Sequence, residues 1–273
     1  MDLTILILPK AGKRENGRET EAGVTGSARK PKRRQECLGM TIQAVLFDLD
    51  GTLLDRDTSL LRFVHDQYER IGALQLVQKD VFCERFIELD QHGYVWKDKV
   101  YEQLVAEFAI PDLDASFLLQ DYISRFPQHC IAFPHLHETL GQLQQQGIKL
   151  GLISNGFGQF QYANLQALGI AHFFEAVLIS EWEGLRKPDP AIFQRALSKL
   201  RVPPEQAIYV GDHPENDVRA SRAVGMKAVW KRSDQFAAAA EADAVIADLA
   251  EVIGIALPAV QLRRQASRDL DFI

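Results

Sequence analysis

The sequence predicts an α/β fold built on a Rossmann-like parallel sheet. From residue 42 onward, short apolar runs rich in Val, Ile and Leu alternate with stretches of helical periodicity. Such near-continuous apolar runs are typical of strands buried on both faces, and their alternation with helices indicates parallel strands. A chain of 273 residues has room for one domain of this kind with an insert.

Six short apolar runs are predicted to be strands, and helices fit the segments between them. The predicted strands are 43–47, 149–154, 176–180, 207–211, 227–230 and 244–246. The predicted helices are 134–146, 157–168, 190–200, 214–224 and 234–241. Pro190 and Pro214 suit the first turn of a helix, where the backbone needs no amide donor.

A long segment without convincing strands interrupts this alternation after the first strand. Apolar residues at helical spacing recur through residues 57–133, as at Leu60 and Val64, and predict about four helices. We therefore expect a catalytic core at 41–56 and 134–258, with 57–133 as an inserted all-helical cap domain. An insert at this point lies over the carboxyl ends of the strands, where open α/β sheets bind ligands.

The two ends of the chain differ from this pattern. Residues 1–40 are polar and basic without helical or strand periodicity, so we expect a disordered N-terminal extension. Its basic stretch 29–34 suits a solvated tail better than a targeting arm. Residues 259–273 are assigned to a C-terminal tail. The sequence leaves open whether residues 1–39 belong to the mature protein.

Charge, cysteines and hydropathy exclude several classes of function. Residues 1–40 hold nine of the 31 Lys and Arg but only five of the 37 Asp and Glu, so the remainder is strongly acidic. An acidic domain is a poor binder of nucleic acid. No apolar run reaches the ~18 residues of a membrane span. Cys37, Cys83 and Cys130 are isolated, which predicts neither a disulfide nor a zinc site and favours a reducing, cytoplasmic location.

Two aspartates separated by one residue end the first predicted strand. Asp48 and Asp50 follow the apolar run 44–47, and Gly51 and Thr52 come next. An ordinary polar turn is an equal interpretation of this segment alone, because Asp and Gly are frequent in turns.

Three other polar segments lie near the ends of separate strands. The run 154–156, Ser-Asn-Gly, ends the second strand, and Asp212 follows the fourth with Asp217 five residues later. Lys187 precedes the helix predicted to begin at Pro190. Since the carboxyl ends of parallel strands share one edge of the sheet, all these side chains are expected to meet the two aspartates there.

These four segments, in this order and with a helical insert between the first and second, resemble the four motifs of the haloacid dehalogenase-like hydrolase superfamily. The resemblance extends over residues 42 to about 250 and is to the phosphatase branch with a helical cap after the first motif. It implies Mg²⁺ as cofactor and a small phosphorylated metabolite as substrate.

The chemistry of phosphate esters agrees with this resemblance. A carboxylate attacks a dianionic ester only when a cation neutralises the phosphoryl oxygens, and Mg²⁺ binds one or two carboxylates in such sites. Asp48 is the predicted nucleophile, forming an aspartyl-phosphate, and Asp50 the predicted general acid and base. The resemblance assigns Mg²⁺ to the Asp48 carboxylate, the Asp50 carbonyl and the Asp212 carboxylate, with Asp217 supporting the metal shell.

The resemblance also implies the residues that contact the phosphoryl group. The Ser154 hydroxyl and the Asn155 backbone amide are expected to donate hydrogen bonds to it. Lys187 is expected to supply a fixed positive charge, and Thr52 to contribute to binding. The histidines show no metal-ligand spacing, and His213 is predicted to be a loop or helix-cap residue.

A helix-breaking stretch at 93–96 lies within the predicted cap. Trp96 and Lys97 are candidate substrate contacts there, with helix packing as the alternative interpretation of these residues and of the aromatic side chains near them.

The leading functional hypothesis is a Mg²⁺-dependent phosphatase of a sugar phosphate, nucleotide or similar metabolite. A dehalogenase fits less well, because such an enzyme needs no acid at the position of Asp50. A phosphomutase and a non-catalytic phosphate-binding regulatory module stay open, as do the physiological substrate and the oligomeric state.

Overall fold

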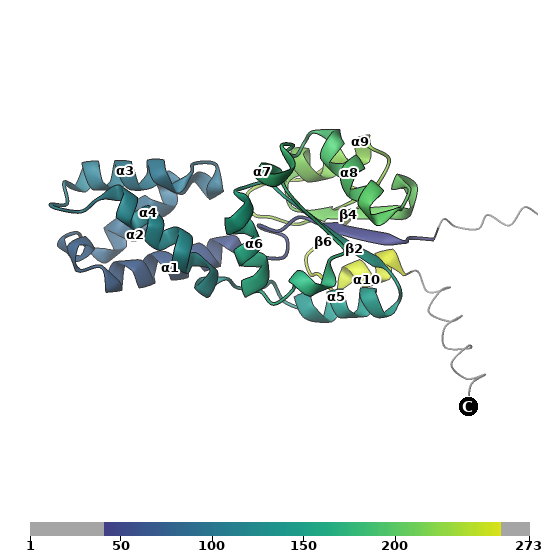
Figure 1. Cartoon of the computed structure of the whole chain (residues 1–273), viewed down its shortest axis with the longest axis horizontal. Helices are drawn as coiled ribbons and strands as arrows, with labels where there is room; N and C mark the ends of the chain where they lie inside the picture. The colour runs from purple at the N-terminus through teal and green to yellow at the C-terminus, as the bar shows by residue number, and fades with distance from the viewer. Residues whose placement is uncertain (1–40, 258–273) are drawn as a thin grey trace, which may run out of the picture. The chain divides into compact units, whose positions relative to one another are not determined.

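The computed structural model describes residues 41–257, and its centre is a parallel sheet of six strands in the order β3-β2-β1-β4-β5-β6 (Figure 1). The predictions for residues 1–40 and for the tail 259–273 lie outside the described residues. The parallel α/β fold predicted from the sequence is confirmed. The strands are β1 (Ala44–Phe47), β2 (Lys149–Ser154), β3 (Ala176–Ile179), β4 (Ala207–Gly211), β5 (Lys227–Lys231) and β6 (Ala244–Ile246).

Helices cover both faces of the sheet. Alternate residues of β1 belong to different apolar clusters: Val45 and Phe47 pack with α5 and α10, whereas Ala44 and Leu46 pack with α8 and α9. Figure 1 shows these two pairs of helices on opposite sides of the strands. The core helices are α5 (Leu136–Gln145), α6 (Gly158–Ala167), α7 (Ser180–Glu183), α8 (Pro190–Leu200), α9 (Ala220–Ala223) and α10 (Glu251–Ala256).

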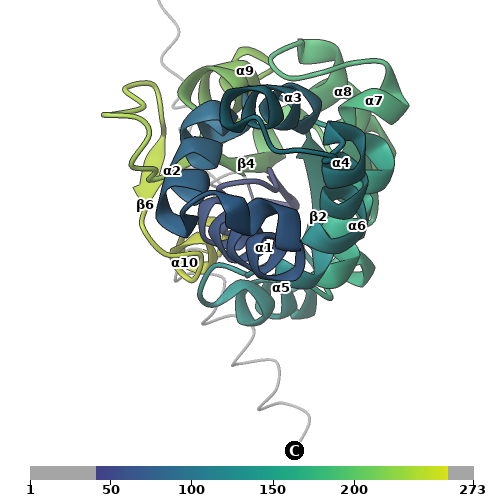
Figure 2. The ribbon, with the colours of Figure 1, turned by 90° about the vertical axis from the view of Figure 1, so that its left-hand side faces the viewer.

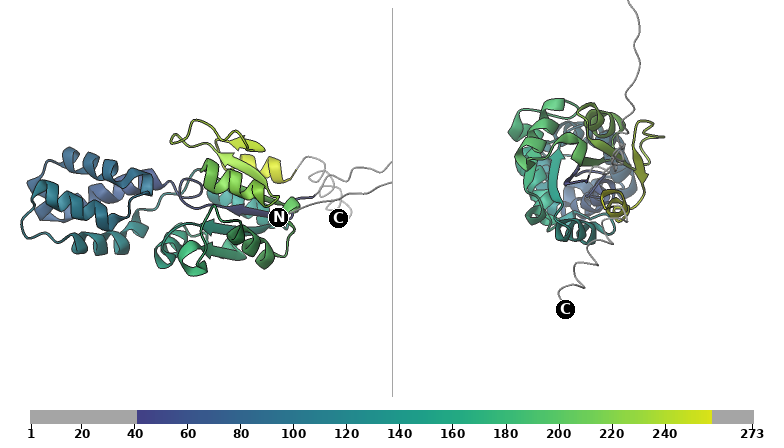
Figure 3. Two further views of the ribbon diagram at one scale, coloured as in Figure 1. Left: turned by 90° about the horizontal axis from the view of Figure 1, so that it is seen from above. Right: turned by 90° about the vertical axis from the view of Figure 1, so that its right-hand side faces the viewer.

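Between β1 and α5 lie four helices that pack together as a bundle (Figure 2). Two chain segments, 49–55 and 130–135, join this helical insert to the core (Figure 3). The insert buries its own aromatic centre, in which the Tyr101 hydroxyl donates to Gln67 at 2.8 Å. Its helices are α1 (Arg56–Arg70), α2 (Lys79–Asp90), α3 (Lys97–Phe108) and α4 (Ala115–Arg125). No helix of the described chain is long and apolar enough to span a membrane.

One predicted helix is wrong, and two observed α-helices of the core, α7 and α10, were not predicted. Residues 234–241 form turns and bends, although their four consecutive alanines have high helix propensity. Only Phe236 and Ala239 of this segment pack against the core, so a helix there has too little apolar surface to bury. Conversely, the short α10 forms because Val252 and Ala256 are buried completely.

The strand order reverses between β1 and β4, which places the ends of these two strands side by side. Phe47 pairs with Val210, and the Asp48 amide donates to the Val210 carbonyl at 2.9 Å. Such a switch point is where open α/β sheets bind ligands. The topology therefore brings Asp48 and Asp212 to a single place.

Candidate active site

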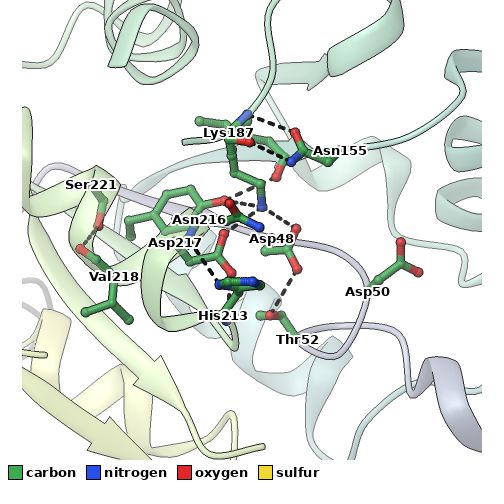
Figure 4. Close-up of polar contacts among 12 residues, drawn as sticks. Asp48, Asp50, Thr52, Asn155, Lys187, His213, Asn216, Asp217, Val218 and Ser221 are labelled. Carbon is green, nitrogen blue, oxygen red and sulfur yellow. Dashed lines mark hydrogen bonds and ion pairs between the residues drawn. The ribbon is translucent and has the colours of Figure 1, made fainter. Parts of the chain in front are cut away.

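Asp48, Lys187 and Asp217 form a buried ion-pair cluster at the carboxyl edge of the sheet (Figure 4). The Lys187 ammonium donates to Asp48 Oδ1 at 2.5 Å and to Asp217 Oδ1 at 2.7 Å. Its third contact is the Tyr209 hydroxyl at 3.0 Å. The ammonium thus holds one oxygen of each carboxylate and leaves Asp48 Oδ2 toward Thr52, whose hydroxyl lies at 3.4 Å.

The backbone of Lys187 is fixed by the side chain of Asn155. The Asn155 Nδ2 donates to the Lys187 carbonyl at 2.9 Å, and the Lys187 amide donates back to Asn155 Oδ1 at 2.9 Å. Burial disfavours the ammonium, but Asp217 and Asp48 outweigh this effect and hold the pKa of Lys187 well above its usual value. Lys187 is therefore a permanent positive charge.

Asp212 adds a third carboxylate to this cluster. Asp48, Asp212 and Asp217 each present an oxygen within 4.8 Å of the others. Burial raises the pKa of Asp48 to about 7 and that of Asp212 to about 8, and the neighbouring carboxylates add to both shifts. Buried carboxylates in excess of their cations suit a divalent metal ion, and this donor set matches the oxygen ligands that Mg²⁺ prefers.

Two glycines, Gly51 and Gly211, leave room for the side chains of Asp212 and Asp217 to lie against the backbone of the site. Gly51 has φ of +77°, and a Cβ on it would lie 2.3 Å from Asp212 Oδ2. A Cβ on Gly211 would lie 2.4 Å from the Cβ of Asp217. A second buried lysine, Lys231, donates to the Gly51 carbonyl at 3.1 Å. Side chains at either glycine would push the cluster apart.

His213 caps the helical turn that carries Asp217, as its sequence position predicted. The segment Pro214–Arg219 is a π-helix, and His213 Nδ1 accepts from the Glu215 and Asn216 amides at 3.1 and 3.2 Å. The proton of the ring is thereby assigned to Nε2, which lies 3.0 Å from the Tyr94 hydroxyl of the insert. The His213 amide donates to Asp217 Oδ2 at 3.0 Å.

The Asp50 side chain points away from the lysine cluster (Figure 4). Gln161 Nε2 donates to Asp50 Oδ2 at 2.5 Å and to the Asn155 carbonyl at 3.2 Å. Asn164 in turn donates to Gln161 Oε1 at 3.2 Å. Burial raises the pKa of Asp50. Gln161 was not predicted, because it lies on the inner face of α6 where the helical period expects an apolar residue.

The remaining predicted phosphate contacts differ in accessibility. Asn155 and Gly156 line the cavity, whereas Ser154 and Thr52 are among the described residues that do not. The Ser154 hydroxyl is buried and finds no hydrogen-bond partner within residues 41–257. An unsatisfied buried hydroxyl is costly and marks a position from which a ligand oxygen or water accepts a hydrogen bond.

A cavity of about 1050 Å³ extends from Asp48 to the helical insert. Its aromatic wall includes Trp96, whose ring centroid lies 4.3 Å from that of Phe157, and also Tyr122 and Phe160. Lys97 lines the cavity although it is almost fully buried. The structure thus brings every predicted site residue to this cavity or directly beneath it.

The family model described as haloacid dehalogenase-like hydrolase matches residues 45–231. The chain belongs to the haloacid dehalogenase-like hydrolase family. The match spans all four motif segments, so the family resemblance stated from those motifs is confirmed.

Several curated relatives of this chain are phosphatases. The glyceraldehyde 3-phosphate phosphatase of Methanopyrus kandleri is 31% identical over 202 residues, covering 71% of this chain and 86% of that protein. The phosphoglycolate phosphatase of Escherichia coli is 29% identical, with coverage of 69% and 80%. The phosphoserine phosphatase of Thermus thermophilus is 42% identical over 98 residues, which are 36% and 39% of the two chains. The predicted enzyme class, a phosphatase of this family, is confirmed.

Solved structures agree on the fold. A haloacid dehalogenase-like phosphatase from Thermococcus onnurineus is 29% identical with a TM-score of 0.57, covering 78% of this chain and 97% of that one. A 2-haloacid dehalogenase from Pseudomonas syringae is 26% identical with a TM-score of 0.53, covering 79% and 98%. Because these neighbours carry names of different reactions, the fold alone does not identify the reaction.

Replacing Lys187 by Met is expected to destabilise the metal-free protein by about 3 kcal/mol or more near neutral pH, because buried carboxylates lose their cation. Chemical denaturation in the presence of a chelator measures this change. The loss should shrink in acid, where Asp48, whose pKa is raised to about 7, becomes protonated. The control Lys199→Met removes an exposed ion pair with Glu183 and should cost below about 1 kcal/mol. Equal losses in the two variants would contradict the proposed cluster.

Proposed function

We propose that this protein hydrolyses small phosphate monoesters through an aspartyl-phosphate on Asp48, with Mg²⁺ as cofactor. The observation that carries the proposal is the buried Lys187 ammonium, which contacts the Asp48 carboxylate and so orients the nucleophile. Relatives named for glyceraldehyde 3-phosphate, phosphoserine and phosphoglycolate support a small phosphorylated metabolite as substrate.

The carboxylates of Asp48 and Asp212 and the Asp50 carbonyl would hold the metal ion. Bound Mg²⁺ supplies positive charge that neutralises the phosphoryl oxygens. Asp217 is proposed as a positioning residue, since its two oxygens already accept from Lys187 and from the His213 amide.

The first half of the reaction is a displacement at phosphorus. Asp48 attacks the phosphoryl group in line with the leaving oxygen. Lys187 and the Asn155 backbone amide stabilise the charge on the phosphoryl oxygens. The Asp50 carboxylic acid protonates the departing alkoxide. Burial raises the pKa of Asp50, which favours the protonated form that this step requires.

The second half returns the enzyme to its starting state. Asp50, now a carboxylate, removes a proton from the water that attacks the phosphorus of the aspartyl-phosphate, and phosphate leaves Asp48. Gln161 holds Asp50 beside the Asn155 backbone, so the same carboxyl group is positioned for both steps. We propose residues 57–133 as the cap domain that excludes bulk water during these steps.

Other activities of the fold are less well supported. A dehalogenase has no leaving alkoxide to protonate, so it offers no role for Asp50. A phosphomutase uses the same first steps, and it differs in returning the phosphoryl group to sugar instead of water. A non-catalytic phosphate-binding module would retain binding without turnover.

The Asp48→Asn variant is expected to lose phosphatase activity by about 10³-fold or more, because it removes the nucleophile. The measurement is hydrolysis of an aryl phosphate with and without Mg²⁺. The exposed Asp80→Asn substitution is the matched control and should retain full activity. Hydrolysis by Asp48→Asn at the rate of the unmodified protein would refute the mechanism. If both proteins bind phosphate but neither turns over a broad panel of esters, the binding-module alternative is favoured.

The Asp50→Asn variant is expected to slow turnover about 10²- to 10⁴-fold through loss of the general acid and base. Its Mg²⁺ affinity, measured by calorimetry, should be nearly unchanged because the proposed contact is the backbone carbonyl. A parallel loss of metal affinity and rate would contradict the division of roles between Asp50 and Asp212.

Mg²⁺ is expected to stabilise the fold more at about pH 8 than at about pH 5. Without a cation, Asp212 keeps its proton up to about pH 8 in the folded protein but loses it near 3.8 when unfolded, so stability falls as the pH rises between these values. Mg²⁺ binds the ionised Asp212 carboxylate, so bound metal offsets the stability that the metal-free protein loses as the pH rises. Thermal unfolding with and without Mg²⁺ measures the difference. A pH-independent shift, or the same shift in Asp212→Asn, would argue against this site.

A further inference from the structure

Three charged side chains, of which Asp90 and Lys97 are buried and Arg56 is partly buried, lie together in the helical insert beside the cavity. Arg56 begins α1, Asp90 ends α2 and Lys97 begins α3. Arg56 Nη2 donates to both oxygens of Asp90 at 2.8 Å, and the Lys97 ammonium donates to Asp90 Oδ1. Arg56 and Lys97 both line the cavity. We call these three residues the insert cluster.

The insert cluster carries one more positive charge than negative. Buried charges are normally paired, and here both cations contact the carboxylate of Asp90, while Arg56 has a second, exposed partner in Asp57 at 3.4 Å. Of the three N–H groups of Lys97, one has an acceptor among the described residues, and the Tyr122 ring lies near the ammonium with its centroid at 5.3 Å. Burial lowers the pKa of Lys97 to about 8 although Asp90 opposes this shift. Beyond its contact with Asp90, the Lys97 ammonium therefore has two N–H groups without an acceptor among the described residues.

The position of the insert cluster in the cavity indicates which part of a substrate it would contact. Arg56 and Lys97 line the same cavity as Asp50, the proposed general acid. The phosphoryl contacts come from the strand ends, whereas both of these cations come from the insert. A substrate whose ester oxygen meets Asp50 would direct the rest of its leaving group toward the insert cluster.

We propose that the insert cluster binds a carboxylate on the leaving group, so that the substrate is a phosphate monoester of a hydroxy acid. This inference rests on the proposed phosphatase function. A carboxylate carries the single negative charge that balances the cluster and accepts the two unused N–H groups of Lys97. A second phosphate group, with nearly two charges, would leave an excess of negative charge at this buried place.

The test compares substrates that differ at one group. Phosphoglycolate carries a carboxylate where 2-hydroxyethyl phosphate carries a hydroxymethyl group, and 1,2-ethanediol bisphosphate carries a second phosphate. We expect the kcat/KM of the unmodified protein to be about tenfold to hundredfold higher for phosphoglycolate than for 2-hydroxyethyl phosphate, as for one charge-assisted hydrogen bond. Equal values for these two, or a preference for the bisphosphate, would overturn the inference.

Lys97→Met should reduce that ratio of kcat/KM to about one, because it removes the ammonium whose two unused N–H groups are proposed to bind the carboxylate. Lys99→Met is the matched control, since Lys99 lies on the same helix, is exposed and pairs with Glu102. It should retain the ratio. Retention of the ratio by Lys97→Met would refute the role of Lys97. If Lys97→Met does not fold, Asp90→Asn replaces it: that variant increases the excess charge, so the ratio should rise, and a ratio that does not rise counts against the proposal.

Binding of non-hydrolysable analogues separates this inference from the proposed function. Calorimetry in Mg²⁺ should show 3-phosphonopropionate, in which a methylene replaces the ester oxygen of phosphoglycolate, binding more tightly than propylphosphonate to the unmodified protein, with the difference lost in Lys97→Met. If this holds while no ester is turned over, the carboxylate site stands and the phosphatase function fails. If esters are hydrolysed but the analogues bind equally, the function stands and the carboxylate site is wrong.

Discussion

The active site depends on one buried ammonium group surrounded by carboxylates. Lys187 contacts Asp48 and Asp217 directly, and Asp212 completes a group of three carboxylates within 4.8 Å. The fold provides this concentration of charge by ending β1 and β4 side by side and by turning the chain through a π-helix after His213. Lys187 and the nearby Lys231 provide two positive charges beside three carboxylates, and burial raises the pKa of Asp48 and Asp212, so a divalent metal ion would favour the ionised carboxylates of the proposed reaction.

The part of the site that the sequence predicted follows strand ends. Asp48 and Asp212 follow buried apolar runs, where parallel strands deliver side chains to a shared edge, so their proximity follows from topology. Gln161 and Tyr209 were missed because they occupy inward positions of a helix and a strand, where periodicity expects apolar packing. Their polar atoms are revealed only by the partners they contact, Asp50 for one and Lys187 for the other.

Local helix propensity gives a wrong prediction for one segment of the core. The alanine-rich segment 234–241 has the composition of a helix, but it connects two neighbouring strands and has only two side chains to bury. Tertiary packing therefore decided against the helix. In the insert the opposite holds: four amphipathic segments enclose a dense aromatic centre, and the sequence periodicity predicts their presence well. Trp96 and Lys97 lie at the start of α3 and line the cavity.

Two parts of the chain thus contribute different kinds of recognition. In the proposed reaction the sheet edge would supply the phosphoryl contacts, and the insert would supply aromatic side chains and the positive charges of Arg56 and Lys97. The Tyr94 hydroxyl and His213 Nε2, 3.0 Å apart, connect the insert directly to the turn that carries Asp217. This division suits a family in which the same displacement is applied to different leaving groups.

The central claim is that Asp48 accepts the phosphoryl group. A crystal structure determined with Mg²⁺ and beryllofluoride, an analogue of a phosphoryl group bonded to a carboxylate, tests it most directly. The proposed mechanism predicts beryllium bonded to a carboxylate oxygen of Asp48, with Lys187 and the Asn155 backbone amide contacting the fluorides. Beryllium bonded to Asp50, Asp212 or Asp217 instead of Asp48 would contradict it.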